Sequence, residues 1–313
     1  MSAMLRMGAA GGRLAEAQCR LVARRITARG GPAVATVAVT TSDERPRQPA
    51  RRAADAAVTA LREALLRGEV DAVVRSFGAV FGAPPPGVRL AAVPEREDPR
   101  DALVWPDGGT LKDLPANARV GTGSPHRSAQ ILLKLDRRVV PVPVDGDVDA
   151  RLELLRNREV DALVLAMAGL TRLGLADIGR PLAASVMVPA PAQGALAVEC
   201  REDDVWTAAL LRVVDHPPTR ARVLAEYAFL AALDTSRAAP VGALALPVRD
   251  GVLRMEGLIA AADGSMAVRQ KISGSVTRPG ELGRDLAASM LRAGGAALLD
   301  IESRTSKTED ALR

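Results

Sequence analysis

Apolar and polar positions recur along the chain in two similar blocks. The segment EVDAVV at residues 69–74 returns as EVDALV at residues 159–164, and each copy follows an amphipathic helical pattern, over residues 59–67 and 149–158. Each copy is typical of a buried strand and ends in small residues. A helix that leads into a buried strand, found twice at the same relative position, predicts two similar α/β lobes rather than one continuous sheet.

The pattern changes at about residue 217. It then predicts a helix, three strands separated by Asp-Gly turns, and a last helix, over residues 219–233, 243–248, 252–259, 266–272 and 280–299. We therefore expect lobe 1 in residues 1–98 plus about 190–216, lobe 2 in residues 99–189, and a small C-terminal α+β domain in residues 217–313.

Composition narrows the range of partners. Apolar residues make up 48% of the chain and charged residues 25%, as in folded proteins. Aromatic residues make up only 2%, too few to stack the bases of a single-stranded nucleic acid, and the net charge of +5 arises from interspersed basic and acidic residues. The most apolar stretch, residues 181–198, contains Pro189, Pro191, Gln193 and Gly194, which are unsuited to a membrane span. We expect a cytoplasmic protein that binds neither nucleic acid nor membrane.

Metal and disulfide chemistry have little support. Cys19 and Cys200 are the only cysteines, and neither has a CxxC partner or a histidine at ligand spacing. We expect both to be buried packing residues, in a helix and in a strand respectively, and we expect no metal site.

Candidate chemistry is expected at the ends of strands. In two-lobed α/β proteins, ligands bind where the carboxyl ends of the strands face one another. The segments of interest are therefore the loops after Val74, Val120, Val144 and Val164.

Four segments carry a resemblance to a known family. They are LAAVPEREDPRDAL at residues 90–103, AGLTRLG at 168–174, PAQGALAVECR at 191–201 and APVGA at 239–243. Through them the chain resembles the porphobilinogen deaminase (hydroxymethylbilane synthase) family. The resemblance implies two type II periplasmic-binding-protein-like α/β lobes, a third domain that carries a dipyrromethane cofactor on a cysteine, and a monomer.

Two positions depart from the pattern of that family. Arg237 stands where the resemblance implies the cofactor-bearing cysteine, and Ala79 stands where it implies the catalytic aspartate. An alanine methyl group can neither move a proton nor stabilise a cation. On these grounds we expect no dipyrromethane cofactor.

The remaining polar groups of the expected cleft favour an anionic small molecule. Asp145 and Asp147, at a turn where the resemblance implies an Arg-Gly-Asn sequence, are the candidates for a replacement acid. Arg127 is the strongest candidate ligand, because guanidinium binds carboxylates in a bidentate way. Arg172 can instead cap a helix, and Arg151 can instead pair with a local carboxylate. The full set of expected ligand-binding residues is Arg75, Ser76, Thr122, Ser124, Arg127, Arg151 and Arg172.

Three functions are compatible with this sequence. The first is a repurposed enzyme that has lost bilane synthesis and acts on another anionic small molecule. The second is a non-catalytic ligand-binding or regulatory paralogue, and the third is an active hydroxymethylbilane synthase with unusual site residues. We favour the first, because new ionisable groups stand at cleft positions, although fold membership does not decide function.

Overall fold

A computed structural model describes residues 4–40, 50–79, 84–234, 239–247 and 249–299. The chain divides into two compact units. Unit 1 comprises Met1–Asp98, Thr171–Leu175 and Gly194–Arg220, and unit 2 comprises Pro99–Leu170, Ala176–Gln193 and Ala221–Arg313. Unit 2 thus contains most of the expected lobe 2 and most of the expected C-terminal domain, and the division of the chain into three domains stays a prediction.

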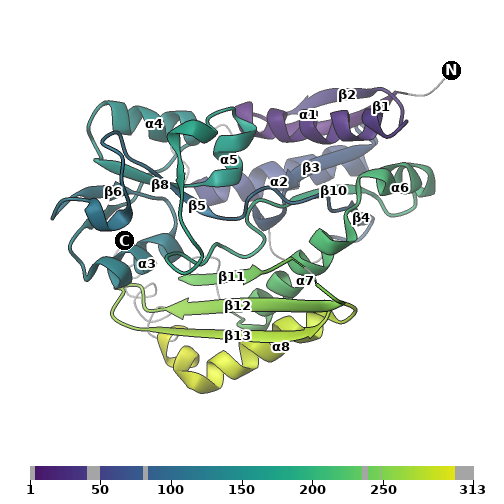
Figure 1. The fold of residues 1–313 in the computed structure, drawn as a ribbon. Coiled ribbons are helices and arrows are strands. Elements are labelled where there is room, and N and C mark those ends of the chain that lie inside the picture. Colours follow the sequence, from purple (N-terminus) through teal and green to yellow (C-terminus); the bar gives the residue numbers. More distant parts are fainter. Residues whose placement is uncertain (1–3, 41–49, 80–83, 235–238, 248, 300–313) are drawn as a thin grey trace, which may run out of the picture. The chain divides into compact units, whose positions relative to one another are not determined.

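Unit 1 is built on a five-stranded sheet with the order β2-β1-β3-β10-β4 (Figure 1). Strand β1 pairs in parallel with β2 and β3, whereas β10 pairs antiparallel with β3 and β4. The strands are β1 (Leu5–Ala10), β2 (Val34–Val39), β3 (Ala72–Ser76), β4 (Val88–Ala92) and β10 (Leu196–Arg201), and the helices are α1 (Arg13–Ala28), α2 (Ala50–Leu66) and α6 (Val205–Leu211).

Unit 2 contains a second five-stranded sheet of the same design, with the order β7-β6-β8-β5-β9. Strand β6 pairs in parallel with β7 and β8, and β5 pairs antiparallel with β8 and β9. These strands are β5 (Asp101–Val104), β6 (Arg119–Gly121), β7 (Val140–Val142), β8 (Ala162–Ala166) and β9 (Arg180–Pro181), with helices α3 (Pro125–Leu135), α4 (Val148–Arg156) and α5 (Met167–Arg172). Two equivalent mixed sheets confirm the predicted α/β class with periplasmic-binding-protein-like lobes.

The repeated EVDA segment has the same structural role in both sheets. Asp71 accepts a hydrogen bond from the backbone N–H of Arg6 at 2.9 Å and is paired with the Arg6 guanidinium at 2.7 Å. Asp161 accepts from the backbone N–H of Arg119 at 2.7 Å and is paired with the Arg119 guanidinium at 2.9 Å. Each aspartate therefore joins the start of one parallel strand to the start of its neighbour. The role of the repeat in this structure is to hold adjacent strands together.

The C-terminal part of unit 2 is a three-stranded antiparallel sheet with helices. Its elements are α7 (Pro217–Ala232), β11 (Val241–Ala245), β12 (Val252–Ala260), β13 (Ala267–Ser275), α8 (Pro279–Met290) and the π-helical turn η5 (Leu291–Gly295). Figure 1 shows α8 running along the sheet, and Gly257 of β12 lies against Phe229 of α7 and Leu286 of α8. The order of elements confirms the α+β pattern predicted from the sequence.

Small aliphatic side chains fill the cores. In unit 1, Cys19, Val22 and Ile26 of α1 are fully buried at helical spacing, against a sheet that contributes Leu5, Met7 and Val198 among others. In unit 2, Val120, Ile131 and Val164 occupy the equivalent core. Because aromatic residues make up only 2% of the chain, both cores consist mainly of Ala, Val and Leu side chains.

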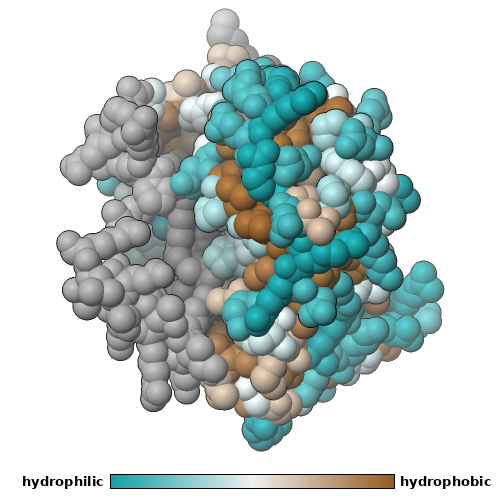
Figure 2. All heavy atoms as spheres, turned by 90° about the vertical axis from the view of Figure 1, so that its left-hand side faces the viewer, coloured by the Kyte–Doolittle hydropathy of each residue, from teal (hydrophilic) through white to brown (hydrophobic). Residues whose placement is uncertain are grey.

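Surface composition is mixed. On the face drawn in Figure 2, hydrophilic side chains cover much of the coloured surface and hydrophobic ones lie between them in small groups. Within the described ranges, no helix is both long and apolar enough to cross a bilayer.

Candidate functional site

In unit 2, the candidate site begins at the carboxyl end of β6. The chain leaves β6 at Gly121, passes through Thr122, Gly123 and Ser124, and enters α3 at Pro125. A Cβ at residue 123 would lie 2.6 Å from the Val144 carbonyl oxygen, so only glycine fits here without a shift of backbone. The Thr122 hydroxyl is buried and accepts a hydrogen bond from the backbone N–H of Ser124 at 3.3 Å. The sequence-predicted Thr122 and Ser124 thus form one turn.

Arg127 lies in the first turn of α3 with most of its donors occupied inside unit 2. Its Nε donates to Asp101 Oδ1 at 2.9 Å, and Nη2 lies 2.8 Å from the same oxygen. Nη1 donates to the Val164 carbonyl at 3.2 Å, and Nη2 also donates to Gln193 Oε1 at 3.1 Å. The Gln193 amide completes the cluster by donating to Asp101 Oδ1 at 2.9 Å. Arg127 therefore holds β5, β8 and α3 together, and its role as a ligand stays a prediction.

His126 and Asp101 leave two polar atoms without hydrogen bonds. Asp101 is fully buried, and its Oδ2 lies 3.9 Å from His126 Nε2, which is too far for a hydrogen bond. Neither atom has a hydrogen-bond partner in the described part of the chain. Burial is the largest single influence on Asp101 and raises its pKa, but the charge of Arg127 together with the interactions of His126 and Gln193 more than offsets it, so the pKa of Asp101 is lowered. Burial lowers the pKa of His126, so its imidazole is neutral at neutral pH, and Nδ1 pairs with the Ser124 hydroxyl.

Arg151 of α4 is the more available guanidinium of the site. Its Nε donates to the Gly146 carbonyl at 3.0 Å. The terminal nitrogens point past Gly123 and make no hydrogen bond or close ion pair with any described residue. Burial and the charge of Arg127 lower the pKa of Arg151, and the two acids of the preceding loop oppose that shift. An anion bound beside Arg151 would offset the free-energy cost of burying its charge.

The two candidate acids differ in what they contact. Asp147 is the N-cap residue of α4 and accepts a hydrogen bond from the backbone N–H of Ala150 at 2.9 Å. Asp145 is exposed on the same loop and interacts electrostatically with Arg151. Asp147 is thus engaged by the helix, a common N-cap arrangement.

In unit 1, Arg75 of β3 is buried in an ion cluster. Its Nε and Nη2 donate to Glu199 Oε1 at 3.0 and 2.6 Å, and Nη1 donates to the Phe77 carbonyl at 3.1 Å. Arg62 of α2 donates its Nε to Glu199 Oε2 at 2.9 Å and its Nη2 to Oε1 at 2.8 Å. Glu199 is fully buried, so the cluster joins α2, β3 and β10 and supplies the anionic partner that a buried arginine requires.

Ser76 and position 79 follow Arg75 at the end of β3. The Ser76 hydroxyl accepts from the Gln18 amide at 3.0 Å, and Gln18 is a buried residue of α1. Ala79 ends the short 3₁₀ turn η1 (Phe77–Ala79). Arg237 lies outside the described residues.

Arg172 ends α5 and belongs to unit 1. Its Nη2 donates to the Gly194 carbonyl at 2.6 Å, whereas its buried Nε has no hydrogen-bond partner among the residues described. Burial lowers the pKa of Arg172 to about 10, although the charge of Glu97 raises it. The guanidinium remains charged at neutral pH.

Sequence reasoning missed the acids that hold the arginines. Asp101 is the first residue of the strand DALV, and Glu199 lies inside the apolar strand LAVECR. An isolated carboxylate in a buried strand requires a cationic partner, and this signal was available in the sequence.

The burial of the two cysteines determines whether either can attach a cofactor. Cys19 and Cys200 are the only two in the chain, and both are fully buried in the core of unit 1. Burial raises the pKa of both thiols, that of Cys200 to about 11. Neither fits the attachment of a dipyrromethane through an accessible thiolate, because the thiolate is the nucleophile.

Solved structures offer fold-level likenesses only. A periplasmic substrate-binding protein of an ABC transporter from Coxiella burnetii is 15% identical, with a TM-score of 0.43, over 70% of this chain and 94% of that protein. A nutrient-binding protein from Burkholderia cenocepacia bound to methionine is 15% identical, with a TM-score of 0.40, over 69% of this chain and 93% of that one.

Curated relatives match almost the whole chain. Porphobilinogen deaminase 1 of Streptomyces coelicolor is 42% identical over 94% of this chain and 97% of its own length. The porphobilinogen deaminase of Nocardia farcinica is 43% identical over 94% of this chain and 88% of its own, and that of Mycolicibacterium paratuberculosis is 42% identical over 95% and 96%.

These relatives correct the function favoured from the sequence. The prediction of a repurposed enzyme that has lost bilane synthesis is wrong, because proteins similar along nearly their full length carry the name of the ordinary deaminase. A non-catalytic paralogue is no better supported. The prediction rested on residues 79 and 237, whereas the match extends over the polar clusters and strands of both units.

Two family models cover the chain. "Porphobilinogen deaminase, dipyromethane cofactor binding domain" matches residues 5–209, and "Porphobilinogen deaminase, C-terminal domain" matches residues 220–292. The prediction that no dipyrromethane is bound is therefore also wrong, since the first model is the cofactor-binding domain itself. With the models and the relatives in agreement, the chain belongs to the porphobilinogen deaminase family.

Proposed function

We propose that this protein is a hydroxymethylbilane synthase, which joins porphobilinogen units into a linear tetrapyrrole. The observation that carries the proposal is the identity of 42–43% to named deaminases over 94–95% of the chain. Each addition forms a carbon–carbon bond between the aminomethyl carbon of one pyrrole and the free ring carbon of the next, and releases ammonia.

The substrate's carboxylate side chains need cationic partners. Arg151 supports this role, because its terminal nitrogens are open and its burial favours an anion beside it. The hydroxyl of Ser124 lies on the adjoining turn. Arg127 and His126 act as positioning residues, since Asp101 fixes the guanidinium and the neutral imidazole pairs with the Ser124 hydroxyl.

Loss of ammonia leaves a cation, which a carboxylate stabilises. Asp145 and Asp147, on the loop before α4, are the candidate acids for this step. The aminomethyl group leaves as ammonia from its ammonium form, and the carboxylate stabilises the cation that remains and takes the proton from the ring carbon that has formed the new bond.

The proposal includes a departure from the family pattern at Ala79 and Arg237. With both cysteines inside the core of unit 1, a dipyrromethane in this protein is held without a bond to cysteine. Non-covalent contacts then retain it, in line with the excess of arginine in the chain.

Genetic complementation tests the proposal in a cell. The gene, carried into a bacterium that lacks its own porphobilinogen deaminase, should restore growth without added haem. An empty vector should not, and the Arg151→Gln variant should restore growth poorly. Failure of the wild-type gene, with the protein present in the soluble extract, would contradict the proposal. A cytoplasmic location, a monomeric state and the absence of nucleic-acid or membrane partners stay predictions.

A further inference from the structure

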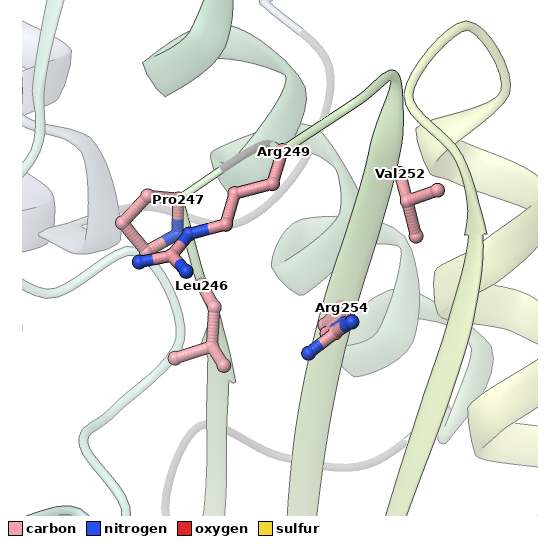
Figure 3. Close-up of a pocket in the computed structure, with 5 residues that line it drawn as sticks. All are labelled: Leu246, Pro247, Arg249, Val252 and Arg254. Carbon is pink, nitrogen blue, oxygen red and sulfur yellow. The ribbon is translucent and has the colours of Figure 1, made fainter.

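A small cavity opens at one end of the three-stranded sheet of unit 2. Its volume is about 320 Å³, and its walls come from the end of β11, the following turn and the start of β12. Figure 3 shows the five residues that line it, Leu246, Pro247, Arg249, Val252 and Arg254.

Two arginines contribute their guanidinium groups to this cavity. In Figure 3 the guanidinium of Arg249 lies beside Pro247, and that of Arg254 extends from β12 toward the side of Leu246. Neither side chain has a hydrogen bond or an ion pair with any residue of the described ranges. Two cations that share one wall without an acid repel each other, so an anion between them is favoured.

The cations elsewhere on the same sheet are paired. Arg269 of β13 is paired with Glu256 at 2.6 Å and donates to the Ala184 carbonyl at 2.8 Å. Lys271 lies 3.9 Å from the same glutamate. Glu256, the acid of β12, is therefore already paired, and Arg249 and Arg254 differ from Arg269 and Lys271 in that their side chains have no hydrogen bond or ion pair with a described residue.

The rest of the cavity wall is apolar and exposed. Leu246 is 45% exposed and Val252 is 38% exposed, and Pro247 lies between the two elements that carry them. Exposed aliphatic side chains beside two guanidinium groups match a ligand with an oxyanion at one end and an apolar body at the other.

We propose that this cavity binds a small organic anion, a carboxylate or phosphate monoester attached to an apolar group. Arg249 and Arg254 hold the oxyanion, and Leu246, Pro247 and Val252 contact the apolar body. The site is separate from the residues assigned to bilane synthesis, and it stands whether or not that proposed function holds.

Calorimetric titration of the full-length protein with phenyl phosphate and with benzoate tests the site and distinguishes the two oxyanions. At least one probe should bind, and the Arg249→Gln/Arg254→Gln double variant should bind it about a hundredfold more weakly. Arg284→Gln/Arg292→Gln removes the same charge from exposed positions in and after α8 and should bind as the wild type does. Leu246→Ala should weaken phenyl phosphate binding more than binding of inorganic phosphate.

Methyl NMR gives a second readout that does not depend on the double variant folding. Phenyl phosphate or benzoate should shift the methyl signals of Leu246 and Val252 in the wild type and not those of core residues such as Leu5. Absence of binding for both probes at about 10 mM would overturn the proposal. Equal affinity of the wild type and the Arg249/Arg254 variant, or shifts confined to other residues, would also overturn it.

Discussion

Arg127 and Arg151 differ in how many of their donors the protein already uses. Arg127 gives its donors to Asp101, Gln193 and a strand carbonyl, whereas Arg151 gives one to the Gly146 carbonyl. A guanidinium that is buried but open gains most from an incoming carboxylate. At the scale of residues, Arg151 is therefore a better candidate than Arg127 for binding a ligand carboxylate.

Replacement of Arg151 by glutamine should lower kcat/KM for porphobilinogen by about tenfold to a hundredfold, because one shielded charge-assisted contact is worth roughly 1.5–3 kcal/mol. Arg156→Gln on the same helix is the matched control, since Arg156 is exposed and paired with Glu153. It should leave kcat/KM within about twofold. Equal losses in the two variants would show that Arg151 acts only through the general charge of α4.

Acid should destabilise the protein partly through His126. Burial lowers its pKa, so below about pH 6.5 the unfolded chain binds a proton that the folded state resists. Stability from this group is complete above pH 6.5 and is lost as the pH falls toward the folded-state value. Asp101, whose pKa is also lowered, acts in the same direction at lower pH.

Urea unfolding at pH 7.5 and pH 5.5 measures this effect. The loss of unfolding free energy between the two values should be smaller in His126→Gln than in the wild type, by about 1 kcal/mol. An identical loss in both proteins would show that His126 does not resist protonation in the folded state.

At the scale of elements, the two helices of the C-terminal region approach closely through a glycine. A Cβ on Gly283 of α8 would overlap the Ala225 carbonyl oxygen and lie 2.7 Å from the Phe229 backbone nitrogen of α7. Backbone atoms cannot rotate away, so the helices would have to separate.

Gly283→Ala should therefore destabilise the protein by about 1–3 kcal/mol, the usual cost of overpacking. Gly280→Ala, in the first turn of the same helix, is the control, because its Cβ would meet only the tip of the flexible Arg284 side chain. Alanine's higher helix propensity should leave that variant as stable as the wild type or slightly more stable. Thermal unfolding distinguishes the two, and a Gly283→Ala midpoint at or above that of Gly280→Ala would contradict the packing account.

Sequence periodicity predicted the elements better than it predicted their partners. The two EVDA repeats and the antiparallel C-terminal strands lie where the pattern indicated, because burial imposes a period on each element. The pattern predicted a helix over residues 59–67, yet α2 (Ala50–Leu66) begins earlier, as expected for the alanine-rich segment that precedes the pattern. The clusters around Glu199 and Asp101 escaped prediction, since their members come from strands and helices far apart in sequence.

At the scale of the whole molecule, the match to the family extends over nearly the whole chain, whereas the function favoured from the sequence rested on expectations at single positions. The sequence-based prediction of function weighed positions 79 and 237 above the rest of the chain, and that weighting was wrong. One consequence of those positions remains, because no cysteine outside the unit 1 core is present to carry a cofactor.

Intact mass under denaturing conditions should equal the mass of the unmodified sequence, because Cys19 and Cys200 are inaccessible to a cofactor in the folded state. Iodoacetamide at pH 8 should modify neither thiol before unfolding and both afterwards, since burial raises their pKa values. A denatured chain heavier by a dipyrrole would refute attachment without cysteine, and rapid alkylation of the folded protein would refute the burial of the thiols.

The central claim is that this chain turns over porphobilinogen, and the most direct measurement is product formation by the purified protein. Porphobilinogen loss, ammonia release and hydroxymethylbilane, trapped as uroporphyrin after acid and oxidation, are followed together. Protein made in a host without its own deaminase excludes contamination. The account predicts steady formation of bilane, with ammonia released for every pyrrole joined and a lower rate in Arg151→Gln. A folded wild-type protein that forms no bilane over many hours, even with dipyrromethane primer supplied, would contradict it.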